Sequence, residues 1–225
     1  MKFQYFYIFF TLLFSGVCSS QNSITFQDQL KEIQALRSSS NDGQFSFDEK
    51  IKFAKKAVNF SELTKVDTVI LKSKRNLSML FLQNGDFESY KRISFSNLDY
   101  ANKINDTISI AHSNYFLGFY YHLLEAHDSA YYYYHKAEKV YEGLNDNFEI
   151  ANTLFEIAEI QRDEKDFTGS EVTSVEAIAL LNLLEQTNEV RRLKSFLYNN
   201  LGAVFGQLEQ YEESIFYHKK GFELK

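Results

Sequence analysis

Hydrophobic residues recur along this chain at the spacing of an amphipathic helix. Near the start they sit three or four residues apart within 26–36, which predicts a first helix with one apolar face: Phe26, Leu30, Ile33 and Leu36. Serine, asparagine and glycine then cluster in Ser38–Gln44. These residues favour turns, so a loop is expected there.

A second helix is expected over 47–58. Ser46 precedes it and Glu49 follows three residues later, which is the pattern of a capping box. Ala54 and Ala57 share one face of this helix. Residues 21–67 are therefore expected to form an irregular helical hairpin that caps the rest of the chain.

From residue 68 onward, one pattern of small and large residues comes round four times. It begins at a small residue, and these four residues lie 40, 40 and 44 positions apart: Ser78, Gly118, Ala158 and Gly202. Twelve positions after each come Tyr90, Ala130, Ser170 and Ser214. Nineteen positions after each come Asn97, Ala137, Ala177 and Gly221. Repetition at such a period predicts stacked units that share one continuous core.

Each unit is expected to hold two helices and a tight turn. The turns fall at polar sequences between apolar helical stretches: Asn84–Asp86, Glu125–Asp128, Lys165–Asp166 and Glu209–Gln210. Small residues midway along a helix let its partner approach the backbone closely. The sequence therefore predicts an all-α solenoid of antiparallel helix hairpins.

The repeated residues resemble those of tetratricopeptide repeats (TPR). Leu117–Gly118 followed by Tyr121, Ala130 and Ala137 is similar to that motif, and so is Leu201–Gly202 followed by Phe205 and Tyr211. The resemblance covers residues 68–225 as about four repeats, at 71–104, 111–144, 151–184 and 195–225. In the first copy, Ser94 and Asn97 replace the expected large and small core residues. The period also exceeds the usual ~34 residues.

The resemblance implies a non-catalytic protein–protein interaction scaffold. Long-period repeats behind a signal peptide resemble the extracytoplasmic input regions of bacterial signal-transduction proteins. The alternatives are a free-standing exported scaffold or envelope-assembly factor, and, more remotely, a hydrolase. The repeat pattern reaches Lys225 without a polar capping helix. We therefore expect a longer protein with a membrane span beyond this point, or a homodimer formed through this end.

The resemblance also places a peptide-binding groove on the concave face, along the first helix of each hairpin. Helical spacing aligns the candidate residues there: His112, Tyr115, Phe119, His122, Phe155, Glu159, Arg162, Phe196 and Asn199. The expected ligand is a protein or peptide. The alternative is that these aromatic side chains only pack between neighbouring helices.

Composition excludes several other functions. The formal net charge of −6 argues against a nucleic-acid partner. The five histidines show no metal-ligand spacing, so no metal is expected. The sequence contains no nucleophile elbow and no glycine-rich phosphate loop, so neither an enzyme nor a cofactor is expected.

The N-terminus predicts export. A short basic start and the apolar stretch Phe6–Phe14 indicate a signal peptide over 1–20, with cleavage after Ser20. The sole cysteine, Cys18, offers the alternative of cleavage before it and lipidation. The expected location is the periplasm or envelope of a Gram-negative bacterium.

Overall fold

The computed structural model describes residues 25–224, in which ten α-helices form five consecutive hairpins. The expected signal peptide and Cys18 lie outside the described residues. The helices are α1 (Phe26–Asn41), α2 (Phe47–Thr64), α3 (Asp67–Gln83), α4 (Phe87–Ile104), α5 (Thr107–Leu123), α6 (His127–Leu144), α7 (Asn147–Asp163), α8 (Phe167–Asn182), α9 (Asn188–Gln207) and α10 (Tyr211–Glu223).

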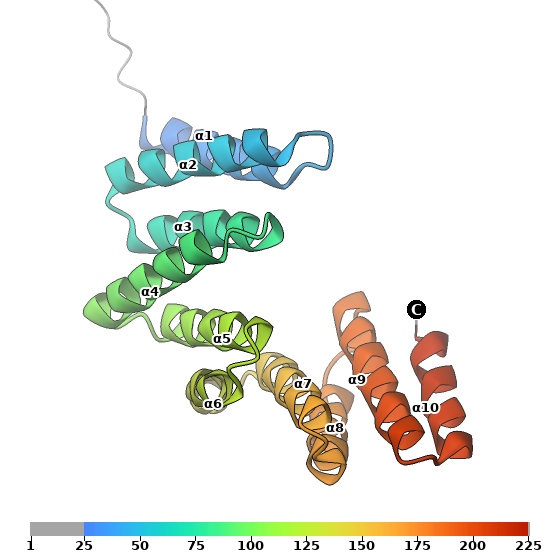
Figure 1. The fold of residues 1–225 in the computed structure, drawn as a ribbon. Coiled ribbons are helices and arrows are strands. Elements are labelled where there is room, and N and C mark those ends of the chain that lie inside the picture. Colours follow the sequence, from blue (N-terminus) through green and yellow to red (C-terminus); the bar gives the residue numbers. More distant parts are fainter. Residues whose placement is uncertain (1–24, 225) are drawn as a thin grey trace, which may run out of the picture.

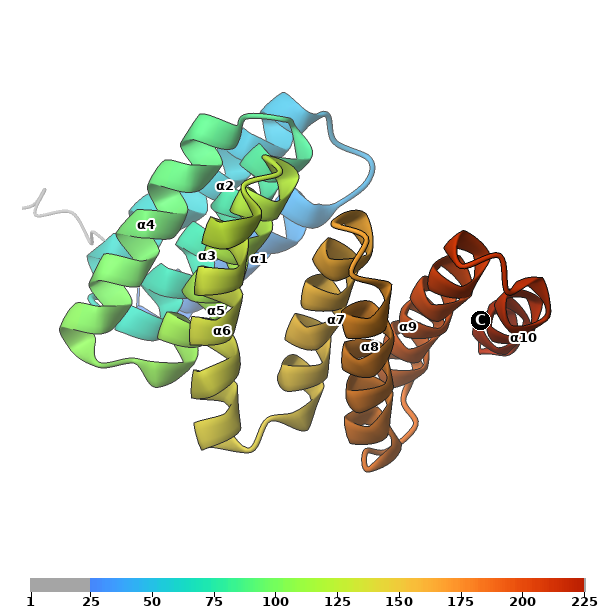
Figure 2. The same cartoon turned by 60° about the horizontal axis from the view of Figure 1, so that its bottom comes forward.

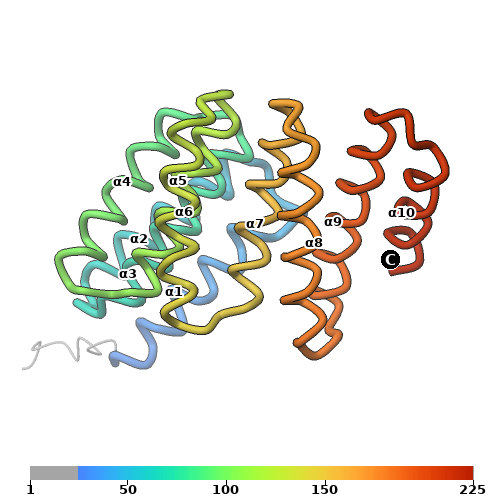
Figure 3. The backbone as a smooth tube through the Cα atoms, turned by 90° about the horizontal axis from the view of Figure 1, so that it is seen from below, coloured from blue at the N-terminus to red at the C-terminus, as the bar shows by residue number. Residues whose placement is uncertain are grey.

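The hairpins follow one another along an arc (Figure 1). Helices α3, α5, α7 and α9 lie on its inner side, and α4, α6 and α8 lie on its outer side. Each second helix packs against the first helix of the next hairpin, and α7 also contacts α9 directly. Helix α10 ends the stack beyond α9, as the two turned views show (Figures 2 and 3).

The sharp connections have a repeated local cause. At most of the connections, the residue two positions before the next helix adopts a left-handed conformation, as at Gly85, Asn105 and Lys165. The following aspartate then caps the next helix: Asp86, Asp106, Asp146 and Asp166 each accept a backbone N–H from three residues ahead. A two-residue turn of this kind folds each helix back on its neighbour.

The small residues that mark the repeats lie where helices touch. Gly118 and Ala158 are buried between the two helices of their hairpins. In two repeats the residue twelve positions later is a serine that donates to the backbone of the small residue. Ser170 Oγ lies 2.7 Å from the Ala158 carbonyl oxygen, and Ser214 Oγ lies 2.7 Å from that of Gly202. The register derived from the sequence is thus the packing register of the hairpins.

The first hairpin confirms one expectation and corrects another. Ser46 and Glu49 form the predicted capping box. The loop predicted at Ser38–Gln44 is wrong over its first four residues, because α1 continues to Asn41. The Ser40 hydroxyl donates to the Arg37 carbonyl within the helix, and it accepts a bond from Asn76 of α3. These bonds satisfy a buried serine that the composition alone assigned to a turn.

Candidate functional site

Side-chain hydrogen bonds connect successive inner helices along the concave side. From α3 to α5, the Arg75 guanidinium donates to His112 Nδ1 at 2.7 Å. From α5 to α7, the Tyr115 hydroxyl donates to Glu156 Oε1 at 3.0 Å. From α7 to α9, Arg162 donates to Asn200. Each inner helix from α3 to α9 is therefore hydrogen-bonded to the next inner helix.

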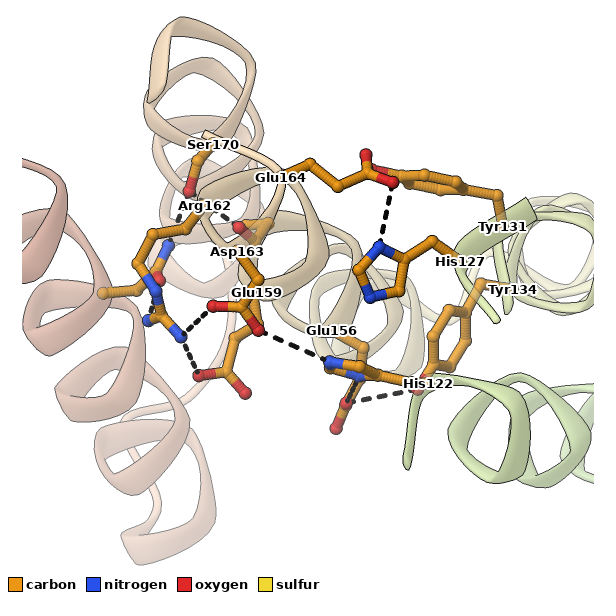
Figure 4. A network of polar contacts seen from close by, with 12 residues as sticks. His122, His127, Tyr131, Tyr134, Glu156, Glu159, Arg162, Asp163, Glu164 and Ser170 are labelled. Atoms are coloured by element: carbon orange, nitrogen blue, oxygen red, sulfur yellow. Dashed lines mark hydrogen bonds and ion pairs between the residues drawn. The ribbon is translucent and has the colours of Figure 1, made fainter. Parts of the chain in front are cut away.

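Glu156 is the centre of a polar cluster on the inner side of the arc (Figure 4). Only 8% of this residue is exposed. Its second oxygen accepts from the Tyr134 hydroxyl of α6 at 3.2 Å and lies 3.5 Å from His122 Nδ1. The hydrogen bond that the His122 ring donates to Glu156 raises the pKa of His122, although burial opposes this shift. A buried carboxylate with three such neighbours fixes α5, α6 and α7 relative to one another.

A second cluster surrounds Arg162 at the C-terminal end of α7 (Figure 4). Its guanidinium lies 3.3 Å from Glu159 and 3.2 Å from Asp163. Burial raises the pKa of Glu159, and the charge of Arg162 opposes that shift. Asn200, which accepts from Arg162, donates in turn to the hydroxyls of Ser170 and Ser174 on α8.

An aromatic pair joins the same two inner helices, α7 and α9. The rings of Phe155 on α7 and Phe196 on α9 stack with centroids 5.9 Å apart. Phe196 is 43% exposed, and the Arg192 guanidinium lies 5.9 Å from its ring centroid. This is the part of the inner side where an aromatic surface faces solvent.

The structure places the nine predicted groove residues in different surroundings. It brings His122, Glu159 and Arg162 into the two polar clusters, and it pairs Phe155 with Phe196. Tyr115 and Phe119 are half-buried and pack against the core. His112 lies farther along the arc beside Arg75. Asn199 points toward α10, where its Oδ1 lies 3.3 Å from His218 Nδ1.

Sequence reasoning missed the residues that join the hairpins. Glu156 and Asn200 both stand two positions before the small residue of their repeat. The same position holds Asn76 in α3, which binds Ser40 across the first two hairpins. A polar residue repeated at this position was the signal that could have identified them.

Neither a metal cluster nor a membrane span is found in residues 25–224. This part of the chain contains no group of three or more His, Cys, Asp or Glu placed to hold a metal. Each of its helices is too short or too polar to cross a bilayer.

Comparison with known proteins shows which solved structures share this fold. No family model matches the sequence, and no curated protein matches it. Solved structures do match. BtubC (BKLC) from P. vanneervenii superposes with a TM-score of 0.71 at 12% identity, over 92% of this chain and 91% of that one. The fold is that of tetratricopeptide-like repeats.

Two further structures agree with this TPR-like fold. A putative kinesin light chain from Podosopora anserina, with nearly identical TPR-like repeats, gives a TM-score of 0.65 at 11% identity. That match covers 89% of this chain and 96% of the other. The apo form of RapI gives 0.62 at 10% identity over 88% of this chain and 64% of its own. At these identities the likeness concerns the fold.

Proposed function

We propose that this protein is a non-catalytic protein–protein interaction scaffold that holds a peptide or protein segment along the inner side of its arc. The observation that carries the proposal is the Phe155–Phe196 pair. Its partly exposed rings bridge two hairpins, and the Arg162 cluster lies on the same two helices. An aromatic patch with a polar border is the usual composition of an interaction hot spot.

The side-chain hydrogen bonds between the inner helices also support this function, because they preorganise the scaffold for binding. Tyr115, Glu156 and Arg162 already hold α5, α7 and α9 together through their side chains. The scaffold is therefore already ordered before a ligand docks on the patch. Binding then costs less conformational entropy, and more of the interaction free energy contributes to affinity.

The test uses random dodecapeptides displayed on phage, selected in parallel on wild type and on Phe196→Ala. The expected result is that peptides enriched on the wild type are not retained by the variant. Val172→Ala is the matched control, because Val172 is an exposed apolar side chain on the outer helix α8. Equal enrichment on wild type and on Phe196→Ala would remove the aromatic patch from the function.

The cellular role that we propose for this scaffold is the extracytoplasmic input region of a bacterial signal-transduction protein. The predicted signal segment and the long repeat period motivate it. A free-standing exported scaffold or envelope-assembly factor is the alternative. Sequencing the gene past codon 225 separates them: a membrane span followed by an output domain supports the first, and a nearby stop codon supports the second.

Export has its own test. Expression of the chain in a Gram-negative host is followed by fractionation and by mass measurement of the purified product. A periplasmic product that begins at Gln21 is expected. A membrane-bound product that begins at a lipid-modified Cys18 supports the alternative anchor, and a cytoplasmic product that retains Met1 contradicts export.

A further inference from the structure

A cavity of about 370 Å³ lies between α3, α4 and α5, away from the aromatic patch. These three helices are successive along the arc (Figure 1). Leu71 and Arg75 line the cavity from α3, Ser94 and Asn97 from α4, and His112 and Phe116 from α5. The volume falls within the range of small-molecule sites, and the walls combine apolar surface with a few polar groups, as in such sites.

Ser94 lines the cavity at a repeat position where the next hairpin carries a large side chain. Sixteen positions after the small residue, the α5–α6 hairpin carries Tyr134, whose ring is fully buried. The equivalent residue of the α3–α4 hairpin is Ser94, which is much smaller. The α7–α8 hairpin also has a serine at this position, Ser174, and there Asn200 of α9 donates to its hydroxyl. The hydroxyl of Ser94 has no hydrogen-bond partner among residues 25–224.

The polar row that joins hairpins is also interrupted here. Glu156 and Asn200 each bind the second helix of the preceding hairpin through their side chains. The equivalent residue beside this cavity is Phe116, whose side chain offers no hydrogen bond. Asn97 is only 5% exposed, and its Oδ1 has no hydrogen-bond partner among residues 25–224. Buried carbonyl oxygens are normally paired, so this oxygen lacks a donor.

A cation, Arg75, also lines the cavity. The Arg75 guanidinium donates to His112 Nδ1 at 2.7 Å, and no carboxylate in the described part of the chain lies within ion-pair distance of it. Burial and the charge of Arg75 lower the pKa of His112 to about 4, so the ring is neutral near pH 7. The nearby Asp106 already accepts the backbone N–H and the hydroxyl of Ser109 at the start of α5. Arg75 therefore keeps donors that suit an anion.

We propose that this cavity binds a small carboxylic acid that also carries an N–H or O–H donor, of the size of an amino acid or hydroxy acid. Arg75 receives the carboxylate, and Asn97 Oδ1 receives the donor. Leu71 and Phe116 contact the apolar part of the ligand. This site lies apart from the Phe155–Phe196 patch and does not depend on the proposed scaffold function.

The experiment is a thermal-shift screen of the purified protein with defined probes, followed by calorimetry on those that bind. The probes are the twenty L-amino acids, lactate and malate, each tested at millimolar concentration. Acetate and the amide of each binding acid serve as matched probes, because acetate lacks the donor and the amide lacks the charge. At least one probe is expected to raise the Tm, with acetate and the amide inactive.

Three variants test whether the ligand binds in the cavity. Arg75→Gln is expected to weaken the affinity about tenfold or more, because it removes the charged donor. Ser94→Tyr introduces the side chain that the next hairpin carries and is expected to abolish binding by filling the space. Asn97→Ala removes the buried acceptor and serves as the independent test if Ser94→Tyr fails to fold. Arg92→Gln, on the exposed side of α4, is the control and should bind like wild type.

The outcomes that overturn the proposal are equally definite. If no probe shifts the wild-type Tm, the cavity does not bind this class of ligand. If acetate acts as strongly as the binding acid, the assigned role of Asn97 is wrong. If binding survives unchanged in both Arg75→Gln and Asn97→Ala, the ligand lies elsewhere.

Discussion

Gly118 of α5 lies directly against the ring of Tyr134 on α6. A β-carbon added to this glycine would lie 2.6 Å from Tyr134 Cδ1, well inside the normal contact distance. Tyr134 cannot retreat freely, because its ring is fully buried and its hydroxyl is bonded to Glu156. The pair explains why this hairpin has a residue without a side chain at position 118.

We predict that Gly118→Ala lowers the free energy of unfolding by about 1–3 kcal/mol, as overpacking in a core usually does. Urea denaturation followed by circular dichroism measures the change. Gly143→Ala is the matched control, since no atom lies within 4 Å of its added β-carbon and alanine favours the helix. A Gly118→Ala protein as stable as Gly143→Ala would show that the contact with Tyr134 relaxes without cost.

Glu156→Gln should weaken the contact between α5 and α7. The loss of charge weakens the bonds from Tyr115 and Tyr134, and we expect a cost of about 1–2 kcal/mol. The variant should also bring the pKa of His122 down from its raised value, because the bond to Glu156 is the main cause of that shift. NMR titration of the histidine rings measures this. Glu164→Gln is the control, since Glu164 contacts His127 instead.

The contact between Glu156 and His122 also makes the stability of the protein depend on pH. Since folding raises the pKa of His122, its contribution to stability is present below the ordinary histidine pKa and is lost as the pH rises through the folded value. The stability difference between wild type and Glu156→Gln should therefore shrink on going from pH 5.5 to pH 8. A difference that grows with pH would contradict the assigned partner.

The sequence predicted the hairpins because their signals are local or periodic. The small residues at Gly118 and Ala158, the capping box at Ser46 and the polar turns each act within one hairpin, so their spacing alone reveals them. The end of α1 could not be read in this way. Ser40 stays helical because Asn76, thirty-six residues away, binds its hydroxyl.

The site was less predictable for the same reason. A helical face can be identified from spacing, and the stripe that contains Phe155 and Phe196 was found from it. The partners across the faces belong to different hairpins, and no local pattern indicates that Glu156 meets Tyr115 and Tyr134. The cavity beside Asn97 could not be anticipated from Ser94, because Ser174 stands at the same repeat position and is bonded by Asn200 of the following hairpin.

His112 should make the protein less stable in acid. Its pKa is about 4 in the folded state, because it is buried beside Arg75, and about 6.5 when unfolded. Between these values the unfolded chain binds a proton that the folded chain does not, so stability falls as the pH drops from 6.5 toward 4. Asp106 and Asp146 oppose this shift. After allowance for solvent screening around a partly exposed ring, we expect an effect of about 1 kcal/mol.

The measurement compares urea midpoints at pH 7 and pH 5 in wild type, His112→Gln and His135→Gln. His112→Gln should lose part of the acid sensitivity. His135→Gln should retain all of it, because that ring is mostly exposed and contacts Glu138 and Tyr131 of its own helix. Equal acid sensitivity in all three proteins would mean that His112 titrates normally in the fold.

Helix α10 presents an apolar face to solvent. Phe222 stands twenty positions after Gly202 and is 75% exposed, whereas Ile178 stands twenty positions after Ala158 and is 8% exposed, in a helix that packs against α9. Ile215 lies seven residues before Phe222 on the same face and is also exposed. Burial of such a face is favourable, so we predict self-association of this chain through α10.

Sedimentation velocity at micromolar concentrations should show a dimer for wild type and a monomer for Ile215→Lys/Phe222→Lys. The control Val172→Lys/Leu183→Lys changes two equally exposed apolar residues at α8 and just beyond its end, and should remain dimeric. A wild type that stays monomeric at every concentration would refute the expected contact.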